Sequence, residues 1–309
     1  MAKFAIIGVG GYVAPKHLKA IYETENSLEA AFDVNDSVGV LDSYFPNVNF
    51  FIEFERFDRH IDKLKRRNGM SIDYVSICSP NYLHDAHIRF SLRSGAHAIC
   101  EKPLVLSPWN LDALAEFETE YERKINTILQ LRLHPAIIEL KKSLDEGRMY
   151  DIDLTYITPR GPWYLMSWKG NQEKSGGVVT NIGIHFFDVL ICLFGDVVNS
   201  QVHLHEATKA SGVMQLKNAV VRWYLSVDAN DLPPSTKPYM KPFRSMTVDG
   251  QEVEFSSGFT DLHTQSYRDI LSGSGFGIED ARRAIEAVYN IRSNKPVNPT
   301  NEYHPYLKK

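Results

Sequence analysis

A glycine-rich turn near the N-terminus limits the folds open to this chain. Residues 3–7 are apolar enough for a buried strand, and Gly8-Val9-Gly10-Gly11 follows at once. A helix is expected from Pro15 to Tyr22, with the proline in its first turn, and a second strand is expected over residues 28–33. This order of strand, turn, helix and strand has the length of one βαβ unit and predicts a parallel sheet.

The turn and the acid that ends the second strand predict a dinucleotide site. Glycines let the backbone approach a pyrophosphate, and the helix N-terminus offers unpaired N–H groups to it. Asp33 can accept hydrogen bonds from ribose hydroxyls, and its charge would repel a 2′-phosphate, which favours NAD over NADP. The third position of the usual G-x-G-x-x-G pattern holds Val13, so the pyrophosphate contacts are expected to differ in detail.

Strands and helices continue to alternate as far as residue 130. Further strands are expected at 48–52, 73–78, 97–100 and 126–130, with helices at 61–67, at 83–94 and from Ser107-Pro108 onward. This pattern predicts an α/β Rossmann-type, doubly wound parallel sheet over residues 1–128. His84 and His87 lie three apart on one helix without a third ligand nearby, so we expect capping and surface roles and no metal site.

The hydrophobic periodicity changes after Pro135. A helix is expected over 136–146, and strands at 152–156, 200–205, 219–227, 246–248 and 252–255, with Asp249-Gly250 as a hairpin turn. Residues 129–309 are therefore predicted to form an α+β domain with a mostly antiparallel open sheet. A late helix, 278–291, is expected to pack back on the first domain.

Two polar groups stand out as candidates for chemistry. Lys102 follows the strand 97–100 within Glu101-Lys102-Pro103, where open α/β sheets bind ligands. Asn181, His185 and Asp188 lie at i, i+4 and i+7 of a helix expected over 180–194, and so share one face. His185 is either a core histidine bonded to Asp188 or an imidazole that Asp188 orients toward a substrate.

Composition argues against several classes of protein. The 309 residues are 43% hydrophobic and 23% charged with a net charge of -4, so no concentrated basic surface for nucleic acid is expected. Cys78, Cys100 and Cys192 are odd in number and lack metal-ligand spacing, which predicts free thiols in a reducing compartment. With no signal peptide and no apolar run near the length of a membrane span, we expect a cytoplasmic protein without membrane contact.

Four segments together resemble the glucose–fructose oxidoreductase / inositol dehydrogenase / rhizopine catabolism (Gfo/Idh/MocA) family. They are Gly8-x-Gly10, Ser79-Pro80-Asn81 with His84, Glu101-Lys102-Pro103, and Gly183-x-His185-x-x-Asp188. The resemblance implies NAD as cofactor, Lys102 and His185 as the catalytic pair, a cis peptide before Pro103, and a homotetramer built through the C-terminal sheets. The expected cofactor contacts are Gly8, Gly10, Gly11, Tyr12, Val13, Asp33, Asn35, Ser79, Pro80, Asn81, His84, Glu101, Lys102 and Gln130.

Within this family, residues 161–170 and 176–185 resemble members that oxidise C3 of UDP-N-acetylglucosaminuronic acid. Those enzymes serve diacetamido-uronic acid synthesis for bacterial O-antigen, and some recycle NADH with 2-oxoglutarate. The implied substrate contacts are Lys102, Arg160, Tyr164, Trp168, Lys169, Asn181 and His185. Asn181 stands where many members have aspartate, and an amide suits a substrate that carries its own carboxylate. The aromatic residues Trp163, Tyr164 and Trp168 either stack on the substrate or pack in the core.

The expected chemistry is oxidation of a secondary alcohol. Lys102 would stabilise the charge on the reacting oxygen and His185 would accept the hydroxyl proton, although the two roles could be shared or reversed. Glu101 would orient Lys102 or contact the nicotinamide ribose. Two alternatives stay open: an NAD-dependent dehydrogenase of a free polyol or sugar, and a non-catalytic NAD(H)-binding regulator, which would need neither Lys102 nor His185.

Overall fold

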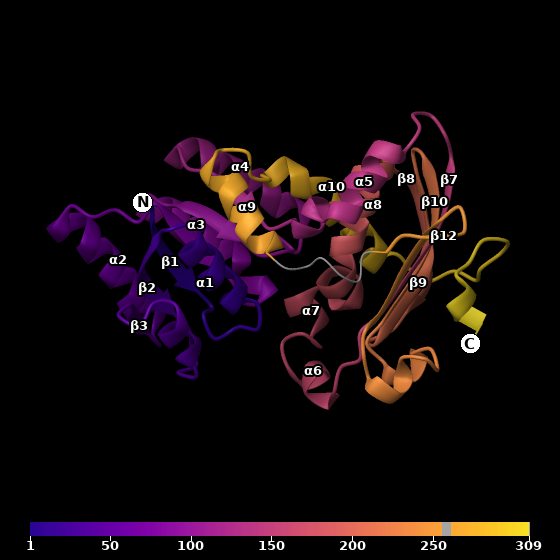
Figure 1. Ribbon diagram of the computed structural model, residues 1–309, viewed down its shortest axis with the longest axis horizontal. Helices are drawn as coiled ribbons and strands as arrows, with labels where there is room; N and C mark the ends of the chain where they lie inside the picture. The colour runs from indigo at the N-terminus through magenta and orange to yellow at the C-terminus, as the bar shows by residue number, and fades with distance from the viewer. Residues whose placement is uncertain (255–260, 309) are drawn as a thin grey trace. The chain divides into compact units, whose positions relative to one another are not determined.

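The computed structural model describes residues 1–254 and 261–308, and the chain divides into two compact units (Figure 1). The first unit combines Met1–Gln130 with Thr260–Ala281, and the second combines Leu131–Phe259 with Arg282–Lys309. The first unit is therefore discontinuous in sequence. The return of the chain to it through helix α9 (Leu262–Leu271) was not predicted.

The first unit is built on a six-stranded parallel sheet in the order β3-β2-β1-β4-β5-β6. Its strands are β1 (Lys3–Ile7), β2 (Ser27–Phe32), β3 (Asn49–Phe51), β4 (Tyr74–Ile77), β5 (His97–Cys100) and β6 (Ile125–Thr127). The order runs outward in both directions from β1 and β4, so the carboxyl ends of these two strands form the switch point where such sheets bind ligands. The predicted doubly wound sheet is confirmed.

Helices cover this sheet as their apolar faces require. They are α1 (Ala14–Glu23), α2 (Phe54–Asn68), α3 (His84–Ser94), α4 (Pro108–Tyr121) and α9. Helix α1 packs beside α9, and together they bury Phe4 and Ile6 of β1 against Leu18 and Tyr267. Helix α3 packs beside α4 and ends at Gly95, whose φ of +90° closes it in the left-handed region.

The second unit contains a six-stranded mixed sheet in the order β12-β11-β7-β10-β9-β8. Its strands are β7 (Tyr150–Ile157), β8 (Val197–His205), β9 (Lys209–Leu216), β10 (Ala219–Ser226), β11 (Phe243–Val248) and β12 (Gln251–Glu252). Among these described strands only β7 and β10 pair in parallel, so the prediction of a mostly antiparallel sheet is confirmed.

Two details of this sheet differ from expectation. Strand β9 was not predicted, because its lysine, serine, glycine and glutamine interrupt the apolar pattern. The Asp249-Gly250 hairpin is confirmed, with φ of +50° and +78° at the two positions. The strand predicted after it ends at Glu252, and its predicted last residue, Phe255, lies outside the described residues.

The helices of the second unit are α5 (Pro135–Ser143), α6 (Pro162–Met166), α7 (Gln172–Ser175), α8 (Ile184–Phe194) and most of α10 (Ile278–Ser293). Helix α8 packs on the sheet through Phe187, whose ring is perpendicular to that of Trp223 at 5.3 Å between centroids. A π-helical turn, Val179–Gly183, precedes α8 in place of the regular helix that was expected. Only residues 278–281 of α10 belong to the first unit.

The segment Gln172–Phe194 is long and apolar enough to cross a membrane by length and composition. The expectation that no apolar run approaches that length was therefore wrong. The most apolar window of this segment is 72% buried, and the core helix of a soluble protein passes the same test. Length and composition are weak evidence for a membrane span here.

Candidate active site

The glycine turn after β1 is a close-packed backbone cradle. Gly8 has a φ of +86°, and a Cβ at this position would lie 2.7 Å from backbone atoms of Cys78 and Ser79. The backbone N–H of Gly10 donates to Oδ2 of Asp33 at 2.9 Å, and that of Asn35 donates to Oδ1 at 2.9 Å. The turn at the start of α1 therefore lies beside an acid at the end of β2, and this arrangement fits a dinucleotide.

The remaining residues of the turn differ in exposure. Tyr12 is exposed, and Val13 is the N-cap of α1 with helical backbone angles and no side-chain hydrogen bond. A Cβ on Gly11 would lie 3.0 Å from the Gly8 carbonyl oxygen. Gln130, another predicted cofactor contact, has a buried Oε1 without a hydrogen-bond partner among the described residues. Such an acceptor is available to a ligand.

Two buried histidines hold the turn that follows β4. His87 Nδ1 lies 2.8 Å from Ser79 Oγ, and the His84 ring lies between the carbonyl oxygens of Ser79 at 2.9 Å and Pro103 at 2.7 Å. Burial lowers the pKa of His84 although both carbonyls oppose this, so the neutral ring donates to one of them at a time. The expected surface roles were wrong for both histidines, and the contact of His84 with a cofactor stays a prediction.

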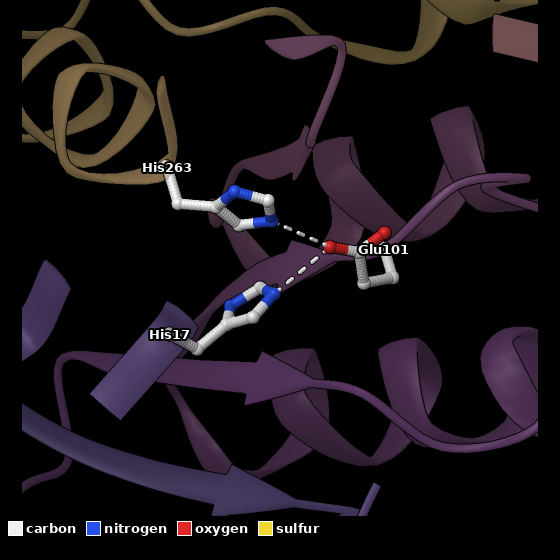
Figure 2. A group of neighbouring side chains, drawn as sticks. All are labelled: His17, Glu101 and His263. Atoms are coloured by element: carbon white, nitrogen blue, oxygen red, sulfur yellow. Dashed lines mark hydrogen bonds and ion pairs between the residues drawn. The ribbon is translucent and has the colours of Figure 1, made fainter. Parts of the chain in front are cut away.

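Glu101 is a buried carboxylate placed between two histidines (Figure 2). Its Oε1 lies 3.0 Å from Nε2 of His17, on α1, and 3.0 Å from Nε2 of His263, on α9. Its Oε2 accepts from the backbone N–H of Lys102 at 3.2 Å. Burial raises the pKa of Glu101, but the hydrogen bonds from His17 and His263 outweigh it and hold the pKa well below its usual range.

The network continues from His17 into the core. Its Nδ1 lies 2.7 Å from the Tyr267 hydroxyl, which in turn lies 2.6 Å from Ser76 Oγ. Burial lowers the pKa of His17, although Glu101 opposes this, so burial favours the neutral ring. The sequence analysis missed His17, His263 and Tyr267. A histidine within the apolar stripe of the first helix, next to Leu18, was the available signal.

The same three side chains are also a possible metal-ligand set. The donor atoms of His17, Glu101 and His263 all lie within 4.8 Å of one another. The expectation that no metal site exists did not consider them.

The peptide bond between Lys102 and Pro103 is cis, as the family resemblance implied.

In the second unit, four of the predicted substrate contacts form one cluster. The Asn181 side-chain amide donates to the Tyr164 hydroxyl at 2.8 Å. Burial raises the pKa of Tyr164, and both Asn181 and the positive charge of Arg160 oppose that rise. Burial, with a further contribution from Arg160, lowers the pKa of Lys169. Two cations beside a tyrosine–amide pair are suited to an anionic ligand with hydroxyl groups.

The two tryptophans of this region differ in exposure. Trp163 on α6 is 77% exposed, so the core interpretation is wrong for this residue. Trp168 is half-buried, with the Lys169 Nζ 5.8 Å from its ring centroid.

His185 is half-buried near the start of α8, and Asp188 is buried one turn later. Both oxygens of Asp188 accept hydrogen bonds from the guanidinium of Arg132, a residue that the sequence analysis missed. The signal for Arg132 was a cation between the apolar residues Leu131 and Leu133. Because the π-helical turn contains Asn181, the expected regular i, i+4 relation to His185 does not hold there, and such turns recur at functional sites.

Family comparison agrees with the two-unit fold. Residues 2–128 match the profile described as "Oxidoreductase family, NAD-binding Rossmann fold", and residues 141–233 match "Oxidoreductase family, C-terminal alpha/beta domain". The chain belongs to the Gfo/Idh/MocA family of oxidoreductases, and its first unit is an NAD-binding Rossmann domain.

Among solved structures, the chain is similar to the WlbA (WbpB) dehydrogenase from Thermus thermophilus in complex with NAD and UDP-GlcNAcA. The identity is 45%, the coverage is 99% of this chain and 100% of that chain, and the TM-score is 0.95. A structure of the same dehydrogenase with NAD and alpha-ketoglutarate is 46% identical with the same coverage and TM-score. WlbA from Bordetella pertussis, at 17% identity over 97% of this chain and 98% of that chain with a TM-score of 0.75, shows the fold alone.

Curated relatives are more distant and are matched only in part. D-glucoside 3-dehydrogenase from Escherichia coli (strain K12) is 26% identical over 67% of this chain and 58% of its own length. Inositol 2-dehydrogenase from Rhizobium meliloti (strain 1021) is 28% identical over 45% of this chain and 41% of its own length. The chain thus spans about half the length of these relatives.

Proposed function

We propose that the protein oxidises the C3 hydroxyl of UDP-N-acetylglucosaminuronic acid to the 3-keto sugar with NAD. The observation that carries this proposal is the 45% identity, over 99% of this chain, to a dehydrogenase solved with NAD and UDP-GlcNAcA. In this proposal the glycine turn and Asp33 bind NAD. Groups suited to an anionic sugar come from the cluster of Arg160, Tyr164, Lys169 and Asn181.

NAD supplies the hydride acceptor when it is bound. Lys102 donates a hydrogen bond to the reacting oxygen and stabilises its developing negative charge. His185 accepts the hydroxyl proton, because an imidazole has an ordinary pKa close to neutrality. The two groups can also exchange these roles. Arg160 and Lys169 neutralise phosphate or uronate charge, and Trp163 and Trp168 offer faces for uracil or the sugar.

The test is a substrate panel followed through NADH absorbance. UDP-GlcNAcA, UDP-GlcNAc, UDP-glucose, free N-acetylglucosamine and myo-inositol are each offered with NAD, and the product is identified by mass spectrometry. Oxidation of UDP-GlcNAcA with at least about tenfold higher kcat/KM than the rest supports the proposal, since a binding difference of about 1.4 kcal/mol gives that ratio. Equal or better use of free polyols would overturn it.

Free-polyol oxidation is the second candidate function, because a curated relative carries the name inositol 2-dehydrogenase. The same panel decides between the two. A protein that binds NADH tightly and turns over none of these compounds would instead favour a regulator.

The proposal extends to the enzyme's setting. NADH is recycled with 2-oxoglutarate, for which the similar structure with NAD and alpha-ketoglutarate is the support. The protein acts in the cytoplasm in diacetamido-uronic acid synthesis for O-antigen, as a homotetramer formed through the second-unit sheets. Light scattering tests the tetramer. Restoration of turnover by 2-oxoglutarate, after a first burst has stopped, tests the recycling.

A further inference from the structure

The carboxylate of Glu101 is completely paired although it is buried. It is 6% exposed, and an ionised carboxylate in such a place is strongly unfavourable unless hydrogen bonds compensate it. Oε1 has the two imidazoles of His17 and His263, and Oε2 has the backbone N–H of Lys102. One side of the carboxylate is therefore held by the two histidines, while the other side holds the backbone of Lys102.

Burial favours the neutral ring of His17, and a ring with a single N–H sets the direction of the hydrogen bonds that run from Glu101 to Ser76. Its single N–H must be on Nε2, because a lone pair on Nε2 would face the Glu101 carboxylate. Nδ1 then accepts from Tyr267, whose oxygen accepts from Ser76. The chain ends at Ser76, which is 0% exposed, so it leads into the core and is not a proton path to water.

The backbone on both sides of Lys102 is held as well. The Pro103 carbonyl oxygen lies 2.7 Å from His84 Nδ1, and the Glu101 N–H donates to the Ile77 carbonyl at 3.0 Å. We propose that His17 and His263 are positioning residues that hold Glu101 as an anion, so that Glu101 fixes the backbone of Lys102 for the reaction. This inference rests on the proposed function, in which Lys102 contacts the reacting oxygen.

A bound metal ion is the competing explanation of the same cluster. A metal would take the Nε2 lone pairs of both histidines and would reverse the tautomer of His17, with Nδ1–H donating to Tyr267. The two Nε2–Oε1 distances of 3.0 Å are those of hydrogen bonds, and both oxygens of Glu101 already have donors. The hydrogen-bonded anion therefore accounts for the geometry without an ion.

Two variants of His17 separate the positioning role from a structural role. His17→Gln places an amide N–H where Nε2 lies, to donate to Glu101, and His17→Asn places an amide oxygen where Nδ1 lies, to accept from Tyr267. Each variant keeps one of the two hydrogen bonds, so both should lose similar stability in urea unfolding. We expect His17→Asn to lower kcat about 10- to 100-fold with the KM for NAD and sugar within about threefold, and His17→Gln to keep kcat within about threefold.

His97→Gln is the matched control. His97 starts β5, the strand that leads to Glu101, and its ring accepts the Lys124 N–H at 2.8 Å. We expect this variant to keep kcat. Equal losses of kcat in His17→Asn and His17→Gln, or losses that follow unfolding midpoints across all three variants, would overturn the positioning role.

A second measurement needs no substrate. Long-range ¹H–¹⁵N spectra of the histidine rings report the tautomer of His17, assigned by comparison with His17→Gln. We expect Nε2–H; an Nδ1–H tautomer, or one equivalent of metal in the purified protein, would overturn the proposal in favour of a metal site.

If the wild-type protein oxidises no UDP-sugar, the proposed function fails. The tautomer of His17 still shows in that case whether His17 donates to Glu101. If the wild-type protein is active and the His17 variants behave alike, only this inference fails.

Discussion

The guanidinium of Arg132 and the carboxylate of Asp188 form a bidentate ion pair inside the second unit. Nε donates to Oδ2 at 2.9 Å and Nη2 donates to Oδ1 at 2.7 Å, while Asp188 is 2% exposed. The pair joins the short turn 130–133 to helix α8, which carries His185. It therefore fixes the helix from which the proposed base projects.

Breaking this pair on one side should be costly. Arg132→Met leaves a buried carboxylate without its partner, and we expect a loss of about 3 to 5 kcal/mol in the free energy of unfolding, measured in urea. The double variant Arg132→Met with Asp188→Leu removes both charges and should recover much of that loss. A double variant no more stable than the single one would contradict this account of the pair.

Removing the proposed catalytic groups should affect turnover more than binding. We expect Lys102→Ala and His185→Ala each to lower kcat by about 10²- to 10⁴-fold. Each variant removes a group that accepts the hydroxyl proton or stabilises the negative charge on the reacting oxygen. NAD affinity, measured by calorimetry, should change little in His185→Ala. Lys142→Ala, at an exposed lysine on α5, is the control and should keep full turnover. Near-normal turnover in both test variants would show that the assignment is wrong.

The cation cluster should act on the sugar and not on the cofactor. Since Arg160 and Lys169 are proposed to neutralise substrate charge, we expect each alanine variant to raise the KM for UDP-GlcNAcA by about 10-fold or more, with the KM for NAD nearly unchanged. The exposed Lys217 supplies the control variant, Lys217→Ala. Equal effects on both KM values would remove Arg160 and Lys169 from the substrate site.

Stability should fall in mild acid because of His304. This side chain is 1% exposed, its Nε2 lies 3.0 Å from Thr155 Oγ1, and burial lowers its pKa to about 4. The unfolded chain binds a proton there below an ordinary pKa of about 6.5, whereas the folded chain does not, so stability is lost as the pH falls from about 6.5 toward 4. The contribution is up to about 3 kcal/mol.

The measurement is urea unfolding at pH 8 and at pH 5 for the wild-type protein and His304→Phe. The phenylalanine ring can keep the stacking on Tyr224, and it cannot titrate. The variant should therefore lose less stability between the two pH values than the wild-type protein does. An identical pH dependence in both proteins would show that His304 does not contribute.

Local features of the sequence were sufficient for much of the fold. The glycine turn and the Asp249-Gly250 hairpin each depend on residues close together in the chain, and the structure confirms them. Strand β9 was missed because its polar residues and Gly212 hide the alternation, although both its neighbours in the sheet supply hydrogen bonds. The π-helical turn was missed because an apolar helical pattern does not show a change of hydrogen-bond spacing.

The sequence by itself determined the family, the NAD-binding βαβ unit and the lysine at the end of β5, because these depend on short motifs with a local physical cause. Only the tertiary structure decided the surroundings of that lysine. Glu101 meets His17 from 84 residues away and His263 from 162 residues away, and Asp188 meets Arg132 from 56 residues away. A buried charge requires hydrogen-bond donors, and here the folded chain supplies them from residues that are far apart in sequence. The spacing of residues in the sequence therefore does not predict these pairs.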